Sequence, residues 1–141
     1  LDIDGCLIPW TRKPGVKHEF EPSCIKAANY IIDKTGAVVV ISSSWRLNFN
    51  LEQLNEMLID AGFICGAIRT TKLPEKGDSG LYIAKTRAQE IQEDITAHQI
   101  INFVVIDDDT DTKVFGERCI LCDVEVGLTQ KLAIKAVAVL Q

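Results

Sequence analysis

The fold is indicated by the stretch AVVVISSS at residues 37–44, in which an unbroken apolar run ends in three serines. Such a run is expected for a strand that is buried on both faces, as the strands of parallel sheets are. The stretch NFVVIDDD at residues 102–109 repeats the pattern but ends in aspartates. Two shorter strands are predicted over 63–68 and 119–121, with helical patterns in between. The sequence therefore predicts an α/β fold with a mostly parallel sheet.

Start and stop signals place four helices around these strands. Pro22 suits the first turn of the first helix, and Gly36 suits its C-terminal cap. The other three helices are expected to begin after polar residues that can cap them, namely Asn50, Thr86 and Thr129.

The composition predicts one globular domain over residues 1–141, since 47% of the residues are hydrophobic. No apolar stretch approaches the ~20 residues of a membrane span, so we expect no membrane partner. The net charge of −5 argues against a protein that coats nucleic acid without specificity. Five cysteines in apolar surroundings predict buried free thiols in a reducing compartment, the cytoplasm. The sequence indicates no oligomeric state.

Carboxylates gather at the ends of two apolar runs. Asp2 and Asp4 lie two residues apart, and in an extended strand such residues point to the same side. Asp107 and Asp108 follow the second run. Carboxylates in such places are costly unless a hard divalent cation compensates their charge. The pattern indicates a magnesium-dependent phosphoryl-transfer enzyme. Because Asp2 stands almost at the first residue, we also expect the chain to begin inside its first strand.

Two other phosphate or cation motifs are excluded. Counted from Asp107 as an EF-hand calcium loop, position six is Thr112 and position twelve is Arg118, where glycine and glutamate are required. The sequence also contains no GxxxxGK[ST] motif, so it is not a P-loop kinase.

Four motifs follow one another along the chain: DIDG at 2–5, ISSSWR at 41–46, Arg87 at a helix start, and Asp107-Asp108. Their order resembles the haloacid dehalogenase-like (HAD) hydrolase superfamily, and the closest likeness is to the HAD domains of "Swiss army knife" RNA repair proteins. The resemblance covers nearly the whole chain. It implies a Rossmann-like three-layer α/β/α sandwich. The segments between the motifs leave no room for a large cap domain, so we expect a capless phosphatase.

The resemblance also implies a role for each carboxylate. Asp2 would be the nucleophile that forms an aspartyl-phosphate, and Asp4 would act as general acid and then as general base. Mg²⁺ would be held by the Asp2 carboxylate, the backbone carbonyl of Asp4, and Asp107 or Asp108. Either member of the last pair could hold the ion directly, with its neighbour holding a coordinated water.

Further residues are expected to bind the phosphate. Ser42 would offer a hydroxyl and a free backbone amide, with Ser43 as the alternative, or these serines could cap the next helix. The third-motif cation would be Arg87, with Lys85 as the alternative. Arg46 could contact the substrate phosphate or form a surface salt bridge.

An open site without a cap favours a large phosphorylated substrate. The basic residues within 12–18 fit an anionic polymer, so the end of an RNA or DNA strand is the expected substrate. A nucleotidase and a protein phosphatase are alternative enzymes. A degenerate HAD-like binding or scaffold module is the alternative without catalysis, although the complete aspartate set argues against it.

Overall fold

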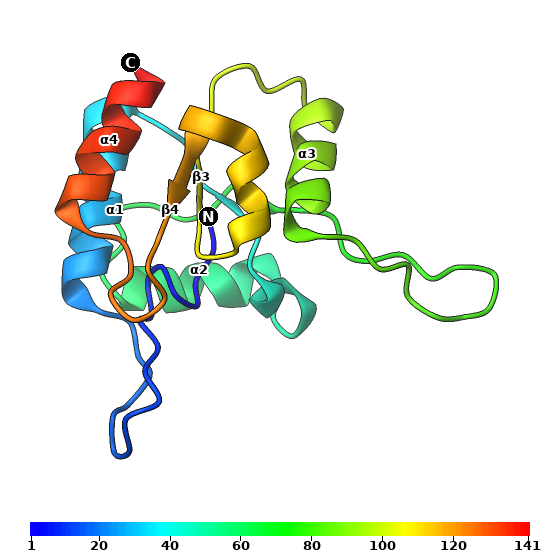
Figure 1. Cartoon of the computed structure of the whole chain (residues 1–141), viewed down its shortest axis with the longest axis horizontal. Helices are drawn as coiled ribbons and strands as arrows, with labels where there is room; N and C mark the ends of the chain where they lie inside the picture. Colours follow the sequence, from blue (N-terminus) through cyan, green and yellow to red (C-terminus); the bar gives the residue numbers. More distant parts are fainter.

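The computed structural model describes residues 1–141 and is an α/β fold with short strands (Figure 1). In chain order the elements are α1 (Pro22–Thr35), β1 (Val40–Ile41), the 3-10 helix η1 (Ser44–Leu47), α2 (Leu51–Asp60), β2 (Arg69–Thr70), α3 (Arg87–Ala97), β3 (Val105–Asp107), the 3-10 segment η2 (Thr110–Arg118), β4 (Cys119–Leu121) and α4 (Gln130–Leu140).

The strands form two parallel pairs, β1 with β2 and β3 with β4. The first residues of the chain lie between the pairs. The amino group of Leu1 donates to the Val40 carbonyl (2.8 Å), and the Ser42 amide donates to the Leu1 carbonyl (3.0 Å). On the other side the Asp2 amide donates to the Ile106 carbonyl (2.9 Å). Hydrogen bonds therefore link β2, β1, the first residues, β3 and β4 in that order, with Asp2 near the middle.

The predicted α/β class is confirmed, and each predicted helix start is found. Gly36 adopts a left-handed φ of 66° and donates to the Ile32 carbonyl, which closes the end of α1. Asn50 and Thr86 each form a capping box at the start of α2 and α3, and Thr129 caps α4. Helices α1 and α4 pack side by side (Figure 1). The strands are only two or three residues long, so a complete three-layer sandwich is not established.

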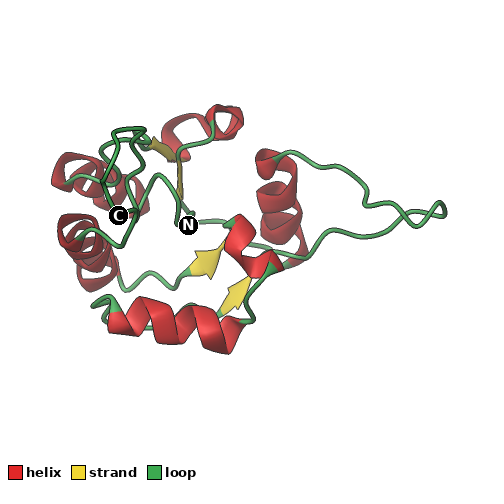
Figure 2. Cartoon of the chain, turned by 90° about the horizontal axis from the view of Figure 1, so that it is seen from below, coloured by secondary structure: helices red, strands yellow, loops and turns green.

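The strand predicted over 63–68 is wrong. That segment consists of bends and irregular backbone, and the paired strand β2 follows it at Arg69–Thr70. The side chain of Asn55 explains the difference, because its amide group donates to the Ala67 carbonyl (3.0 Å) and accepts from the Ala67 amide (2.7 Å). These bonds satisfy the backbone of Ala67 without a neighbouring strand. After β2 the chain forms a long loop that extends away from the body to α3 (Figures 1 and 2).

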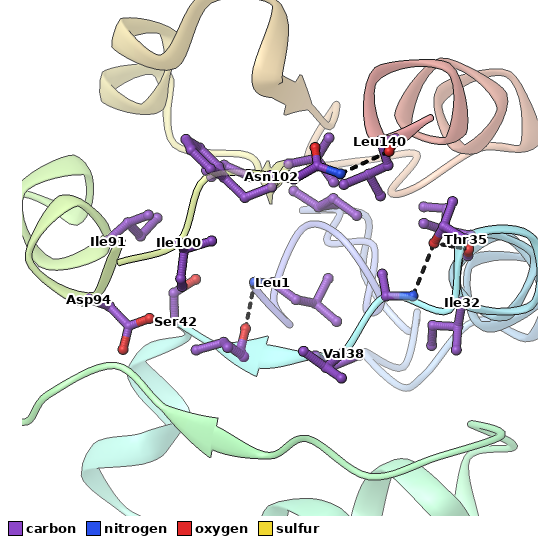
Figure 3. Close-up of a pocket in the computed structure, with 18 of the residues that line it drawn as sticks. Leu1, Ile32, Thr35, Val38, Ser42, Ile91, Asp94, Ile100, Asn102 and Leu140 are labelled. Carbon is purple, nitrogen blue, oxygen red and sulfur yellow. Dashed lines mark hydrogen bonds between the residues drawn. The ribbon is translucent and has the colours of Figure 1, made fainter. Parts of the chain in front are cut away.

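A large apolar cavity lies beside Leu1 (Figure 3). Its volume is about 650 Å³, and its walls come mainly from α1, α3 and the segments that lead into β1 and β3. Ile32, Val38, Ile100 and Leu140 are among the apolar side chains that line it. None of the helices is both long and apolar enough to cross a membrane.

Candidate active site

The predicted motifs meet at the carboxyl ends of the central strands, where open parallel sheets bind ligands. Arg87, at the start of α3, lies between two aspartates. Its Nη1 atom is 3.1 Å from Asp2 Oδ1 and 2.9 Å from Asp107 Oδ2. Both carboxylates are buried. The guanidinium therefore compensates two carboxylates that would otherwise repel each other.

The pKa values reflect this contact. Burial lowers the pKa of Arg87, but the charges of Asp2 and Asp107 outweigh burial and leave it raised. Burial also raises the pKa of Asp107, and the charge of Asp2 adds to the shift, while Arg87 opposes it. The alternative cation, Lys85, pairs instead with Glu93, with 2.7 Å between Nζ and Oε1. The geometry thus favours Arg87 over Lys85 as the cation of the site.

The two predicted metal-binding aspartates have different surroundings. Asp107 accepts from Arg87 and, through Oδ1, from the Asp109 amide (3.0 Å). Asp108 instead faces Asp2, and burial, a hydrogen bond with Asp2 and the charges of Asp2 and Asp107 raise the pKa of Asp108 to about 7. Asp108 is therefore the better candidate for a direct metal ligand.

Gly5 permits Asp108 to approach the first motif. Gly5 has a φ of 78°, and a Cβ added to it would lie 2.6 Å from Asp108 Oδ2. This position therefore requires glycine for both its conformation and its space.

The acidic pair fits a hard divalent cation. One ligand atom from each of Asp2, Cys6 and Asp108 lies within 4.8 Å of the others. A hydrogen bond with Cys122 and burial raise the pKa of the Cys6 thiol well above its usual value, so this sulfur stays protonated and is a poor ligand. The two carboxylates supply the oxygen ligands that Mg²⁺ prefers, and a cation would relieve their repulsion.

The serines are placed differently from the expectation. The Ser42 amide is not free, since it donates to Leu1, and its hydroxyl is buried without a partner beside the apolar cavity (Figure 3). Ser43 caps η1, with its hydroxyl accepting from the Trp45 amide (3.2 Å). The free amide of this turn is that of Ser43, which makes no hydrogen bond within the chain.

Arg46 points into the protein. Its side chain is only 2% exposed, and Nη1 donates to the carbonyls of Ser42 and Ser43 (both 3.1 Å). Nη2 lies 2.6 Å from Glu90 Oε2 on α3. Of the two expected roles the structure shows the salt bridge, but it is buried rather than on the surface. Arg46 thus ties the second motif to the helix that carries Arg87.

Asp4 lies apart from the buried cluster. The chain turns at Ile3, so the extended geometry that predicted a common direction for Asp2 and Asp4 ends before Asp4. Asp4 is exposed, and its Oδ2 accepts from the indole Nε1 of Trp45 (2.9 Å). The sequence alone does not indicate this contact, because it joins residues 41 positions apart and no local pattern signals it.

A pocket of about 540 Å³ opens beside these residues. Its lining is formed by Asp4, Gly5, Ile8, Trp10, His18, Trp45, Asp108 and Val124. Asp4, the predicted acid/base, and Asp108, the candidate metal ligand, therefore face the same pocket. The larger cavity beside Leu1 is apolar and shares none of these lining residues. Of the predicted site residues only Ser42 borders it.

Residues 1–133 match the family model of the HAD domain in Swiss Army Knife RNA repair proteins. The chain belongs to this family. No curated protein and no solved structure matches the chain. The match covers all four motifs of this HAD domain, and its structure brings Asp2, Arg87, Asp107 and Asp108 together.

The stability of the metal-free HAD domain should depend on Asp108. Its pKa is about 7 in the folded protein and near 3.8 in the unfolded chain, so between these values only the folded state holds the proton. This contribution to stability is present below pH ~4 and is lost as the pH rises to about 7. Melting temperatures measured in EDTA from pH 4 to 8 should show a decline that Asp108→Asn reduces. Identical profiles for the two proteins would contradict the assignment.

Proposed function

We propose that this HAD domain is a magnesium-dependent phosphomonoesterase that removes a terminal phosphate from a nucleic acid. The observation that carries the proposal is the contact of Arg87 with Asp2 and Asp107, next to Asp108. It provides a fixed carboxylate nucleophile within a site that can accept phosphate. A Rossmann-like α/β/α sandwich and a cytoplasmic location remain part of the proposal.

The first half-reaction uses two aspartates. The Asp2 carboxylate attacks the phosphorus, and the bond from phosphorus to the leaving oxygen breaks. Asp4 donates a proton to that oxygen, so the product leaves as an alcohol. Trp45 holds the Asp4 carboxyl toward the pocket through its indole N–H. The N–H groups of Arg87 that Asp2 and Asp107 do not use can donate to the phosphoryl oxygens.

In the second half-reaction Asp4 takes a proton from water, and the water oxygen attacks the phosphorus. The bond from phosphorus to the Asp2 oxygen breaks, which releases inorganic phosphate and restores both carboxyl groups. Asp4 suits this double role because it is exposed to the pocket, while the nucleophile Asp2 is buried.

Asp2, Asp108 and the backbone carbonyl of Asp4 would hold Mg²⁺, and Asp107 would hold one of its waters. That carbonyl accepts no hydrogen bond within the chain, so it is free to bind an ion. When bound, the ion supplies positive charge that reduces the repulsion between the carboxylates and an incoming phosphate.

Two observations support a nucleic-acid substrate. The pocket is open to solvent and no segment of residues 1–141 covers it, so a polymer end can reach it. The nearby loop exposes Arg12, Lys13 and Lys17, which could bind further phosphates. The description of the family, which names RNA repair proteins, agrees with this proposal.

Replacing the nucleophile tests the proposed chemistry. Asp2→Asn removes the attacking carboxylate oxygen, so we expect phosphate release to fall by at least about 10³-fold, a loss of ~4 kcal/mol in transition-state stabilisation. The substrates are 3′- and 5′-phosphorylated oligonucleotides, mononucleotides and phosphopeptides, each with MgCl₂ or with EDTA. A purified variant with wild-type rates would contradict the mechanism. A preference for mononucleotides or phosphopeptides would favour a nucleotidase or a protein phosphatase, and no hydrolysis by wild type would favour a binding module.

Trp45 should act as a positioning residue for Asp4. Trp45→Phe keeps the aromatic packing against Phe20 and Phe49 but removes the N–H donor. We expect kcat to fall about tenfold, since a hydrogen bond to a charged group contributes ~1.5–3 kcal/mol, while KM changes little. Phe49→Leu is the matched control, because it alters the same aromatic cluster without touching Asp4. The positioning role is refuted if the control loses as much kcat as Trp45→Phe.

A further inference from the structure

An aromatic pair projects over the proposed site from the loop between Pro9 and Phe20, here named the basic loop. This loop extends below the body of the molecule (Figure 1). Its base is fixed at both ends, since the Trp10 amide donates to the Val124 carbonyl (2.7 Å) and the Glu21 amide donates to the Leu7 carbonyl (2.9 Å). The loop therefore holds its side chains in a defined place relative to the first motif.

Trp10 and His18 stack within this loop. Their ring centroids lie 5.3 Å apart with an interplanar angle of 27°. The His18 Nε2 atom lies 2.9 Å from the Thr11 carbonyl oxygen, which fixes the imidazole ring. Trp10 remains 41% exposed, so the pair does not serve to bury the indole. The guanidinium carbon of Arg12 lies 5.9 Å from the centre of the Trp10 ring.

The stacked pair faces the same pocket as the reacting groups. Trp10 and His18 line the opening of about 540 Å³ together with Asp4 and Asp108. A phosphate next to the aspartates would therefore place the group that carries it against the aromatic rings. Exposed aromatic side chains bind planar rings by stacking, and every nucleobase can stack on them because each has a flat π-face.

We propose that Trp10 and His18 form a stacking platform for the base of the nucleotide that carries the terminal phosphate. Arg12 and the nearby Lys13 and Lys17 would bind the backbone of the same strand. The preferred substrate is then the unpaired end of a strand, because a stacked and paired base could not lie on the platform. This inference rests on the proposed function and adds to it the residues that recognise the substrate.

The test compares three phosphate substrates. They are a single-stranded oligonucleotide with a terminal phosphate, the same oligonucleotide with an abasic terminal residue, and acetyl phosphate, which has no ring. For wild type we expect kcat/KM to be higher with the terminal base than without it. Trp10→Ala should lower the rate ratio between the base-bearing and abasic oligonucleotides about tenfold, mainly through KM.

Tyr82→Ala is the matched control. Tyr82 is also an exposed aromatic residue beside a cation, with Lys76 5.4 Å from its ring centre, but it lies on the long loop before α3. The control should keep the wild-type ratio. The platform is contradicted if Trp10→Ala lowers all three rates equally, if the ratio does not change, or if Tyr82→Ala lowers it to the same extent.

A binding measurement separates this inference from the proposed function. Fluorescence anisotropy in EDTA, with a label on the end that lacks the phosphate, reports affinity without turnover. We expect Trp10→Ala to weaken binding of the base-bearing oligonucleotide about tenfold relative to the abasic one. If wild type binds in this way but hydrolyses none of the substrates, the phosphatase proposal fails and the platform stands. If it hydrolyses acetyl phosphate but shows no preference for a terminal base, the platform fails and the chemistry stands.

Discussion

The candidate site depends on one interaction, the contact of the Arg87 guanidinium with Asp2 and Asp107. Two carboxylates buried at the end of a sheet are strongly unfavourable unless a positive charge lies between them. Arg87 supplies that charge from a different element, so α3 must lie against the central strands. The Ala88 amide strengthens this placement by donating to Asp111 Oδ2 (3.1 Å) on η2. The salt bridge between Arg46 and Glu90 links the same helix to the second motif.

This arrangement gives the four aspartates different surroundings. Asp107 accepts hydrogen bonds from Arg87 and from the Asp109 amide, whereas Asp108 faces Asp2. Asp4 lies outside the buried group, at the pocket, and accepts a hydrogen bond from the indole N–H of Trp45. In the proposed two-step phosphate hydrolysis, Asp2 would be the nucleophile, Asp4 the acid/base, and Asp2 with Asp108 the cation-binding pair.

The sequence predicted the features that local chemistry determines. The caps Asn50, Thr86 and Thr129 could be predicted because each side chain accepts from an amide in the first turn of its own helix. The grouping of Asp2, Asp107 and Asp108 could be predicted because the carboxyl ends of parallel strands lie at the same edge of a sheet. The absence of a strand over 63–68 could not be predicted, because it depends on hydrogen bonds between the Asn55 side chain and the backbone of Ala67. The carboxylates that Arg46 and Trp45 contact, on Glu90 and Asp4, lie more than forty residues away, so only the folded chain reveals them.

The central claim is that Asp2 becomes phosphorylated during turnover. It is tested most directly by mixing the protein with acetyl phosphate and MgCl₂, quenching in acid, reducing with borohydride and mapping the product by mass spectrometry. Borohydride converts an aspartyl-phosphate to homoserine, so the account predicts homoserine at position 2 and at no other aspartate. A preparation that releases phosphate but carries the modification elsewhere, or carries none, would contradict it.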